Sequence, residues 1–188
     1  AILVVHWAGR ICDMKKIKII AKKYNLFIVE DACHAALAKS NSEFAGNFGD
    51  IGCFSLHPLK NLNVWGDGGM IVTKNNKIAS KLKLLRNHGL INRNEIKIFG
   101  INSRLDTIQA VVANHLLLKL KDITKKRRMN AKLLDTDLGN LKEIKIPKRI
   151  DNLYEVFHLY CIRVKNRDNL MKFLHTKGID AKKHYPIP

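Results

Sequence analysis

Short apolar runs alternate, in the first half of the chain, with segments in which hydrophobic residues recur every three or four positions. The apolar runs cover residues 2–5, 26–29, 51–56 and 69–73, and each has the length of a buried strand. Between the first two runs, residues at helical spacing follow Asp13, a residue type suited to an N-cap: Met14, Ile17, Ala21 and Tyr24. Strand, helix and strand in this order predict an α/β fold with a mostly parallel sheet flanked by helices.

Two more helices are predicted after the fourth apolar run. Gly89 would close the first as a C-cap, after apolar residues one turn apart: Ile78, Leu82 and Leu85. The second is expected to break near Asp122, to continue through a basic stretch and to end by Gly139. Its apolar positions begin with Leu105, Ile108, Val112 and Leu116.

The character of the chain changes after Pro147. A strand at 160–164, a helix at 169–176 and an extended piece from Ile179 are predicted there. They are typical of the start of a smaller α+β domain. The expected organisation is therefore part of a large domain over residues 1–120, a connecting helical segment over 121–146 and the start of a small C-terminal domain over 147–188.

Composition favours a globular protein and narrows its partners. Of the 188 residues, 46% are hydrophobic and 27% are charged. The formal net charge of +18 invites a nucleic-acid interpretation. However, the excess is mostly lysine, spread over every segment without interleaved aromatic residues, and the densest cluster, 125–128, can be the solvated face of a helix. We therefore expect no nucleic-acid partner, whereas a basic surface also suits anionic, phosphate-bearing substrates.

Apolar segments and cysteines indicate the compartment. No apolar run approaches the roughly 18 residues of a membrane span, and the opening residues lack a signal-peptide layout. The chain starts on a strand without an initiator Met, so we expect the true N-terminus to lie upstream. The cysteines never form a C-x-x-C pair, which favours reduced thiols, no zinc site and a cytoplasmic location: Cys12, Cys33, Cys53 and Cys161.

A lysine supplies the candidate chemistry. Lys60 follows Ser55 by five residues, and the glycine-rich segment 66–69 comes shortly after it. One strand earlier, Asp31 stands at the carboxyl end of an apolar run, where ligands of parallel sheets bind. An amine, a hydroxyl and an acid in this pattern predict a site for a phosphorylated aldehyde, pyridoxal phosphate. The lysine would form the Schiff base, and the acid would hold the pyridinium nitrogen.

Each of these residues also has an ordinary structural interpretation. Asp31 could cap the next turn, and His34, which could bond the ring oxygen of the cofactor, could be a satisfied polar residue beside the core. The glycines suit a turn, with Asp67-Gly68 as a strong turn dipeptide. Trp65 is either a pocket wall or a core residue, and His57 has no assigned role.

Ordered sequence blocks along nearly the whole chain resemble the DegT/DnrJ/StrS-type sugar aminotransferases. These are fold-type I, aspartate-aminotransferase-like enzymes that use pyridoxal phosphate. The blocks are V-H-W-A-G-R, V-E-D-A-C-H-A, G-D-I-G-C-F-S-L-H-P-L-K-N-L, G-D-G-G-M-I-V-T, L-R-N-H-G, G-I-N-S-R-L-D-T-I-Q-A, H-L-Y and H-Y-P-I-P.

The resemblance implies a role for each matching position. Lys60 would form the internal aldimine, Asp31 would pair with the pyridine nitrogen, and His34 would lie beside the ring oxygen. Ser55 would bind the phosphate. Asn102 resembles an asparagine that reaches the phosphate of the neighbouring subunit, which implies a homodimer with shared active sites.

Two departures from the family pattern affect this picture. Leu37 stands where the family usually has Gly, which could reshape the turn behind the cofactor. The G-T-x-A phosphate loop and the end of the small domain do not occur in the sequence, so the resemblance points to the central fragment of a longer enzyme, inactive by itself.

The expected function of the parent protein is transfer of an amino group from an amino acid, with glutamate as the expected donor, to a keto group of a nucleotide-linked sugar. Two alternatives stay open. One is a sugar dehydratase on the same scaffold, although the resemblance implies that such enzymes replace the lysine by histidine and Lys60 is present here. The other is a basic binding or regulatory module without catalysis.

Overall fold

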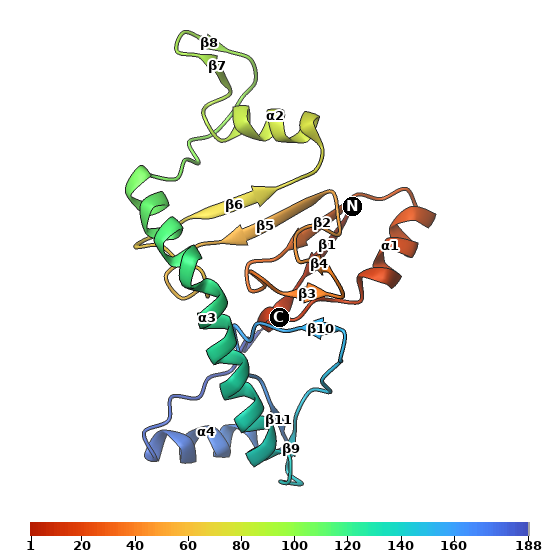
Figure 1. Ribbon diagram of the computed structural model, residues 1–188, viewed down its shortest axis with the longest axis vertical. Coiled ribbons are helices and arrows are strands. Elements are labelled where there is room, and N and C mark those ends of the chain that lie inside the picture. The colour runs from red at the N-terminus through yellow and green to blue at the C-terminus, as the bar shows by residue number, and fades with distance from the viewer. Residues whose placement is uncertain (188) are drawn as a thin grey trace. The chain divides into compact units, whose positions relative to one another are not determined.

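The main sheet of the protein contains four strands and positions most of the predicted site (Figure 1). The computed structural model describes residues 1–187; Pro188, the last residue of the predicted C-terminal domain and of the H-Y-P-I-P block, lies outside them. The strands are β1 (Ile2–Val5), β2 (Ile28–Asp31), β5 (Ile51–Ser55) and β6 (Gly69–Val72), in the order β1-β2-β5-β6.

Three of the four strands run in the same direction. β1 pairs with β2, and β2 with β5, in parallel; Val5 is opposite Asp31, and Asp31 is opposite Cys53. β6 returns antiparallel to β5, with Gly69 opposite Ser55. The prediction of a mostly parallel sheet is confirmed. Because β2 and β5 end at the same edge of this sheet, Asp31 and Ser55 both lie at that edge.

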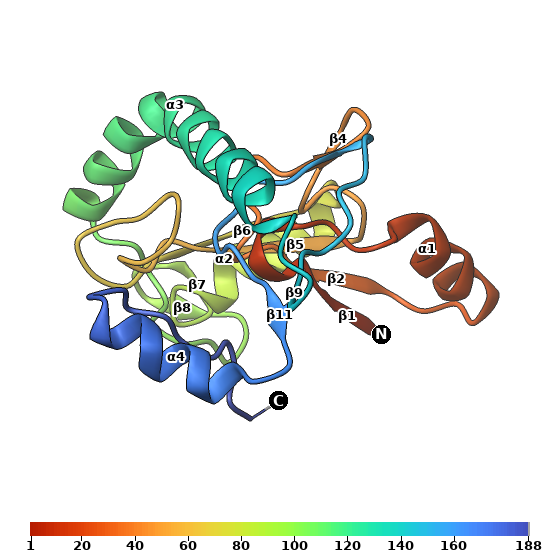
Figure 2. The same cartoon turned by 90° about the horizontal axis from the view of Figure 1, so that it is seen from below.

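Helices and short strand pairs complete the fold. The helices are α1 (Met14–Lys23), α2 (Asn76–Leu85), α3 (Thr107–Leu138) and α4 (Arg167–Thr176), with a 3₁₀ turn, η1, at Trp7–Gly9. Figure 2 shows α1 beside β1 and β2. Small antiparallel sheets join β3 (Lys39–Ser40) to β4 (Glu43–Phe44) and β10 (Leu153–Tyr154), β7 (Leu90–Asn92) to β8 (Glu95–Ile96), and β9 (Ile144–Lys145) to β11 (Arg163–Val164).

The chain divides into two compact units. The first contains Ala1–Ala131 and Arg149–Tyr160, and the second contains Lys132–Lys148 and the described part of 161–188. The domain boundaries expected near residues 120 and 146 stay a prediction. Within residues 1–187, no helix combines the length and the apolar character that crossing a membrane requires.

The first unit contains two apolar clusters. One gathers β1, β2, α1 and the alanines after β2 around Val4, Ile28 and Val156. The other joins the segment after β5 to the middle of α3 through Leu56, Leu62, Val64 and Leu120. The second cluster therefore buries residues on both sides of Lys60, with Leu56 before it and Leu62 after it.

Several helix boundaries differ from those expected. Asp13 does cap α1, since its side chain accepts the Lys16 amide hydrogen bond at 3.2 Å. α3 continues through Asp122 without the predicted break, because this exposed carboxylate is solvated on the helix surface. Gly89 is not the C-cap of α2: the helix ends at Leu85 with Arg86 as its cap.

The strands also begin later or are shorter than expected. β2 starts at Ile28 instead of residue 26, because the Leu26 amide bonds to the Ala21 carbonyl at 2.8 Å and so finishes the end of α1. The strand predicted at 160–164 shortens to Arg163–Val164. The extended piece predicted from Ile179 forms no strand among the described residues.

The basic cluster 125–128 is only partly a solvated face. Lys125 and Lys126 are exposed, whereas Arg127 and Arg128 are half-buried. Arg128 donates to the Glu155 carbonyl at 2.8 Å, and its guanidinium lies over the Tyr154 ring at 4.0 Å. Arg127 donates to the Phe157 carbonyl at 3.1 Å. The two arginines thus fasten the segment after β10 to α3.

A buried ion pair fixes the carboxyl ends of β1 and β2. His6 and Glu30 are both fully buried, and His6 Nε2 lies 2.8 Å from Glu30 Oε2. The carboxylate also accepts the amides of Gly46 at 2.8 Å and Gly49 at 2.6 Å. Burial lowers the pKa of His6, but its contacts with Cys12 and Glu30 outweigh this and raise it to about 9. Burial raises the pKa of Glu30, but the hydrogen bonds from His6, Gly49 and Gly46 bring it below its ordinary value.

Replacing Glu30 by Gln should lower the free energy of unfolding by about 3–5 kcal/mol, because His6 then stays buried without its anion. The exposed pair Lys16–Asp13 provides the control, and Lys16→Ala should change the free energy by at most about 1 kcal/mol. Urea unfolding measures both. A Glu30→Gln loss no larger than that of Lys16→Ala would contradict the anchoring role.

The pair also predicts a pH profile. The depressed pKa of Glu30 gives stability that is present above its ordinary pKa of 4.5 and is lost as the pH falls through the lower folded value. The raised pKa of His6 gives stability that is present below 6.5 and is lost as the pH rises through about 9. Glu30→Gln should remove the acid-side dependence and weaken the alkaline one, since Cys12 also raises the pKa of His6.

Candidate functional site

Asp31 lies at the carboxyl end of β2, next to the buried Glu30. Its Oδ1 accepts the Cys33 amide at 3.0 Å, so the carboxylate does cap the following turn. Its carbonyl accepts the His6 amide at 2.9 Å. The Ala32 amide then bonds to the Cys53 carbonyl at 2.8 Å, which ties this turn to β5. The half-buried Asp31 is therefore held by its backbone on both sides.

Lys60 lies in the connection from β5 to β6, in a turn that starts at Ser55. Ser55 Oγ accepts the His57 amide at 3.2 Å, and the Lys60 amide bonds to the His57 carbonyl at 2.9 Å. After the lysine, the buried Asn61 donates its side-chain amide to the Val156 carbonyl at 3.1 Å. The lysine is half-buried between these anchors.

The charges of Asp31 and Lys60 both affect the pKa of the Cys33 thiol. Burial and then Asp31 raise the pKa of Cys33 to about 12, while the positive charge of Lys60 lowers it. Burial, followed by Asp31, also raises the pKa of Cys53. The charges of the predicted acid and the predicted amine therefore both act on Cys33 at this edge of the sheet. The cysteines are free thiols, and those at 33 and 53 stay protonated at neutral pH.

His34 belongs to the same edge. Its Nδ1 accepts the Ala8 amide at 3.3 Å, and its ring lies against that of His158, with centroids 4.2 Å apart and planes at 39°. His158 had no expected role, because only the fold brings it to a residue more than a hundred positions earlier. His6, Glu30 and Asn61 were likewise missed, although all three occur in sequence blocks that carry the resemblance.

Asn102 lies apart from this group, on an exposed loop. It forms an isolated antiparallel bridge with Asn87, and its Oδ1 accepts a hydrogen bond from Arg104 Nε at 3.1 Å. In the part of the chain that the structure describes, no hydrogen bond or ion pair joins Asn102 to the other four predicted residues. Its loop is instead held by the segment after α2, where Ser103 bonds to the Arg86 carbonyl at 2.9 Å.

Two glycines allow this close pairing of loops. A Cβ on Gly100 would approach the His88 carbonyl carbon to 2.7 Å and would also meet the Gly89 amide. Gly89 has φ +73°, and its amide bonds to the Leu84 carbonyl at 2.8 Å. The backbone at Gly100 packs directly against the backbone of residues 88 and 89, so no side chain could move aside to accommodate a Cβ.

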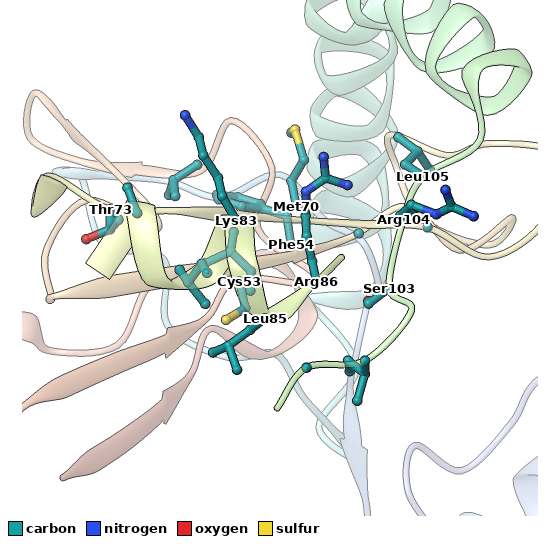
Figure 3. Close-up of a pocket in the computed structure, with 18 of the residues that line it drawn as sticks. Cys53, Phe54, Met70, Thr73, Lys83, Leu85, Arg86, Ser103, Arg104 and Leu105 are labelled. Atoms are coloured by element: carbon teal, nitrogen blue, oxygen red, sulfur yellow. The ribbon is translucent and has the colours of Figure 1, made fainter. Parts of the chain in front are cut away.

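Two cavities of the first unit are distinct from the predicted site. One of about 1230 Å³ lies between β5, β6, α2 and the segment 99–105, and its lining is mostly apolar with Lys83, Arg86 and Arg104 (Figure 3). The other, of about 800 Å³, lies near Trp7 and α1. Neither is lined by Asp31, His34, Ser55, Lys60 or Asn102. The predicted residues therefore form an edge of the sheet rather than either of these hollows.

Known proteins match both the sequence and the structure. The sequence model of the DegT/DnrJ/EryC1/StrS aminotransferase family matches residues 1–188. A dTDP-3-amino-3,6-dideoxy-alpha-D-galactopyranose transaminase from Aneurinibacillus thermoaerophilus is 40% identical over all of this chain and 52% of its own length. The chain spans about half the length of the curated relatives it matches.

Solved structures agree with the fold. S. venezuelae DesV, in complex with a ketimine intermediate, has a TM-score of 0.95 and 36% identity over 99% of this chain and 50% of that chain. NtdA from Bacillus subtilis, with bound cofactor PMP, has a TM-score of 0.88 and 32% identity over 98% of this chain and 43% of its own. The aspartate-aminotransferase-like α/β fold predicted from the sequence is confirmed by this similarity.

Replacing Gly100 by Ala should displace the loop that carries Asn102, because the added methyl group meets backbone atoms only. We expect a loss of about 1–3 kcal/mol in the free energy of unfolding. The neighbouring exposed Ser103 offers the matched control, and Ser103→Ala should change it by no more than about 0.5 kcal/mol. Equal effects of the two variants in urea unfolding would show that the loop tolerates the methyl group.

Proposed function

Because this chain belongs to the DegT/DnrJ/EryC1/StrS aminotransferase family, we propose that it is the central part of a longer enzyme that aminates a nucleotide-linked keto-sugar. The amino donor would be an amino acid, with glutamate as the expected donor. The observation that supports this most directly is that the charges of Asp31 and Lys60 both act on Cys33. Ser55 stands at the same carboxyl edge of the parallel strands. The sugar transaminase from A. thermoaerophilus supports the substrate class.

The residues at this edge fit pyridoxal phosphate. The Asp31 carboxylate and the Ser55 hydroxyl stand at adjoining strand ends, and the Lys60 amine follows in the turn after β5. His34 lies beside them with Nδ1 bonded to the Ala8 amide. Lys60 and Asp31 would hold the two ends of the ring system, His34 its ring oxygen and Ser55 the phosphate. When bound, the cofactor supplies a protonated ring that accepts electrons from the reacting carbon of the substrate.

The chain's own residues then have separate tasks. Asp31 keeps a proton on the ring nitrogen through its negative charge, and the turn at Cys33 keeps the carboxylate oriented. The Lys60 amine removes and returns the proton at the reacting carbon. Buried neighbours on both sides of Lys60 limit the movement of its backbone, so the side chain that carries the amine starts from a fixed position. Donor and acceptor would use the site in turn, which gives ping-pong kinetics.

We propose a homodimer, in which Asn102 completes the phosphate site of the partner. Its exposure, and its separation from the other four residues in the described chain, support this arrangement. The bridge to Asn87 would present the side chain from outside its own site. A cytoplasmic location also belongs to the proposal, since free thiols suit a reducing compartment.

Of the alternatives, the sugar dehydratase lacks support because the reacting position holds Lys60. The non-catalytic module also lacks support, because Asp31 and Lys60 are both present and the charges of both act on Cys33.

Reduction of the full-length protein with borohydride in the presence of pyridoxal phosphate should fix the cofactor to Lys60. Peptide mapping by mass spectrometry locates the adduct. Lys60→Ala should abolish it, and Lys74→Ala, an exposed lysine bound to Glu43, should leave it unchanged. An adduct on a different lysine in the unaltered protein would overturn the assignment.

Mixing two inactive variants tests the shared site. In a heterodimer of Lys60→Ala and Asn102→Ala subunits, one site carries both changes and the other carries neither. We therefore expect activity approaching half that of the normal dimer in the heterodimer fraction. Subunit exchange must be verified by native mass spectrometry. If exchange occurs without recovery of activity, Asn102 does not act across the interface.

A further inference from the structure

The segment 156–159 contacts both sides of the predicted site. The Val156 amide bonds to the Gly9 carbonyl at 3.0 Å, and the Leu159 amide bonds to the Ala8 carbonyl at 3.3 Å. On its other side, the Val156 carbonyl accepts the side-chain amide of Asn61, the neighbour of Lys60, at 3.1 Å. A segment from late in the sequence therefore joins the turn after β1 to the lysine loop.

Within this segment, His158 contacts His34 directly. The ring centroids are 4.2 Å apart and the planes are tilted by 39°, so the two rings are in van der Waals contact. Gly9 allows this approach: with φ +93°, it would place a Cβ 3.0 Å from the His158 amide nitrogen. The contact limits rotation of the His34 ring about its χ2 angle.

The turn after β1 selects the tautomer of His34. Ala8 has φ 59°, a left-handed conformation, and its amide points to His34 Nδ1 at 3.3 Å. A nitrogen that accepts a hydrogen bond carries no proton in the neutral ring, so the proton resides on Nε2. His34 is thereby a donor at Nε2, as a bond to a phenolic oxygen requires.

α3 fixes the backbone of His158. Arg127 Nη1 donates to the Phe157 carbonyl at 3.1 Å and to the His158 carbonyl at 3.4 Å. Phe157 itself has φ 47°, so the chain turns sharply immediately before the histidine. A half-buried guanidinium that bonds two successive carbonyls holds this turn in one conformation.

We infer that His158 is a positioning residue, which orients the His34 ring so that Nε2 donates to the ring oxygen of the cofactor. The inference rests on the proposed function for the identity of the acceptor, but the orientation of His34 does not depend on it. His158 acts through His34: its ring holds the His34 ring in the plane in which Nδ1 faces the Ala8 amide, and that hydrogen bond sets the tautomer.

The test compares His158→Phe, which keeps an aromatic ring, with His158→Leu, which fills space without one, in the full-length protein. His115→Leu, an exposed histidine on α3, is the matched control. The ¹⁵N signals of the His34 imidazole in the cofactor-free protein report the tautomer. We expect the Nε2–H form in the unaltered protein, His158→Phe and His115→Leu, and a mixture of tautomers in His158→Leu.

Pyridoxal phosphate binding gives the second readout. His158→Leu should weaken binding by about twofold to tenfold, the range measured for one aromatic pair, and His158→Phe should stay within about twofold. If His158→Leu does not fold, as judged by thermal unfolding, His158→Asn replaces it in both measurements.

Unchanged His34 signals in the variant without a ring would overturn the inference, as would equal effects of the phenylalanine and leucine variants on the tautomer. Failure of the unaltered protein to bind pyridoxal phosphate would instead overturn the proposed function. In that case the tautomer comparison still decides whether His158 positions His34.

Discussion

The buried carboxylate of Glu30 determines how the functional edge of the sheet is built. A fully buried anion is stable only when its oxygens are satisfied, and here His6 and the amides of Gly46 and Gly49 satisfy them. These partners come from the end of β1 and from the loop that precedes β5. One side chain therefore joins three segments, and misplacing any of them leaves the charge uncompensated.

Asp31 gains its position from this arrangement. Successive side chains of a strand point to opposite faces, so the residue after a buried anchor faces away from the anchor's side. The backbone of Asp31 is held by His6, which is also the partner of Glu30. The position of Asp31 is thus a consequence of the buried His6–Glu30 pair. In the two-residue sequence E-D, the carboxylate of Glu30 has a structural role and that of Asp31 is the candidate for the chemistry.

The sequence alone predicts the parallel strands and the candidate residues on them, because these depend on local patterns. Apolar runs mark β1, β5 and β6 within one or two residues, and the spacing from Ser55 to Lys60 marks the turn. It identified Asp31 as the site acid but gave Glu30 no role, since the structural role of Glu30 depends on its full burial and on partners distant in sequence. The break expected in α3 was wrong for a related reason: Asp122 is a poor helix former, but the packing of Leu120 and Thr124 in the core outweighs that local preference.

Residues distant in sequence complete the site, and these are the ones that local patterns could not supply. His34, Asn61 and the turn at Trp7–Gly9 all contact the segment 156–159, which is fastened in turn by α3. The antiparallel return of β6 and the pairing of Asn87 with Asn102 are likewise properties of the folded chain. Long-range contacts of this kind determine how the site residues are oriented, whereas the sequence already shows which residues are present. For this reason the chemistry of the edge can be predicted from residue types, but its geometry cannot.

The large positive charge has two different uses in this molecule. Part of it is structural: Arg127 and Arg128 bond backbone carbonyls, and Arg10 and Arg149 lie 3.7 and 3.3 Å from the buried Glu155. Most of the remaining excess is exposed lysine, whose field attracts phosphate-bearing ligands but falls off within about 10 Å at ordinary ionic strength. Such a field raises encounter rates without selecting an orientation. Selection therefore depends on groups with fixed directions. At this edge, Asp31 and Lys60 are fixed through the backbone, by His6 and by the neighbouring Asn61, and His34 is fixed through its ring, by Ala8 and His158.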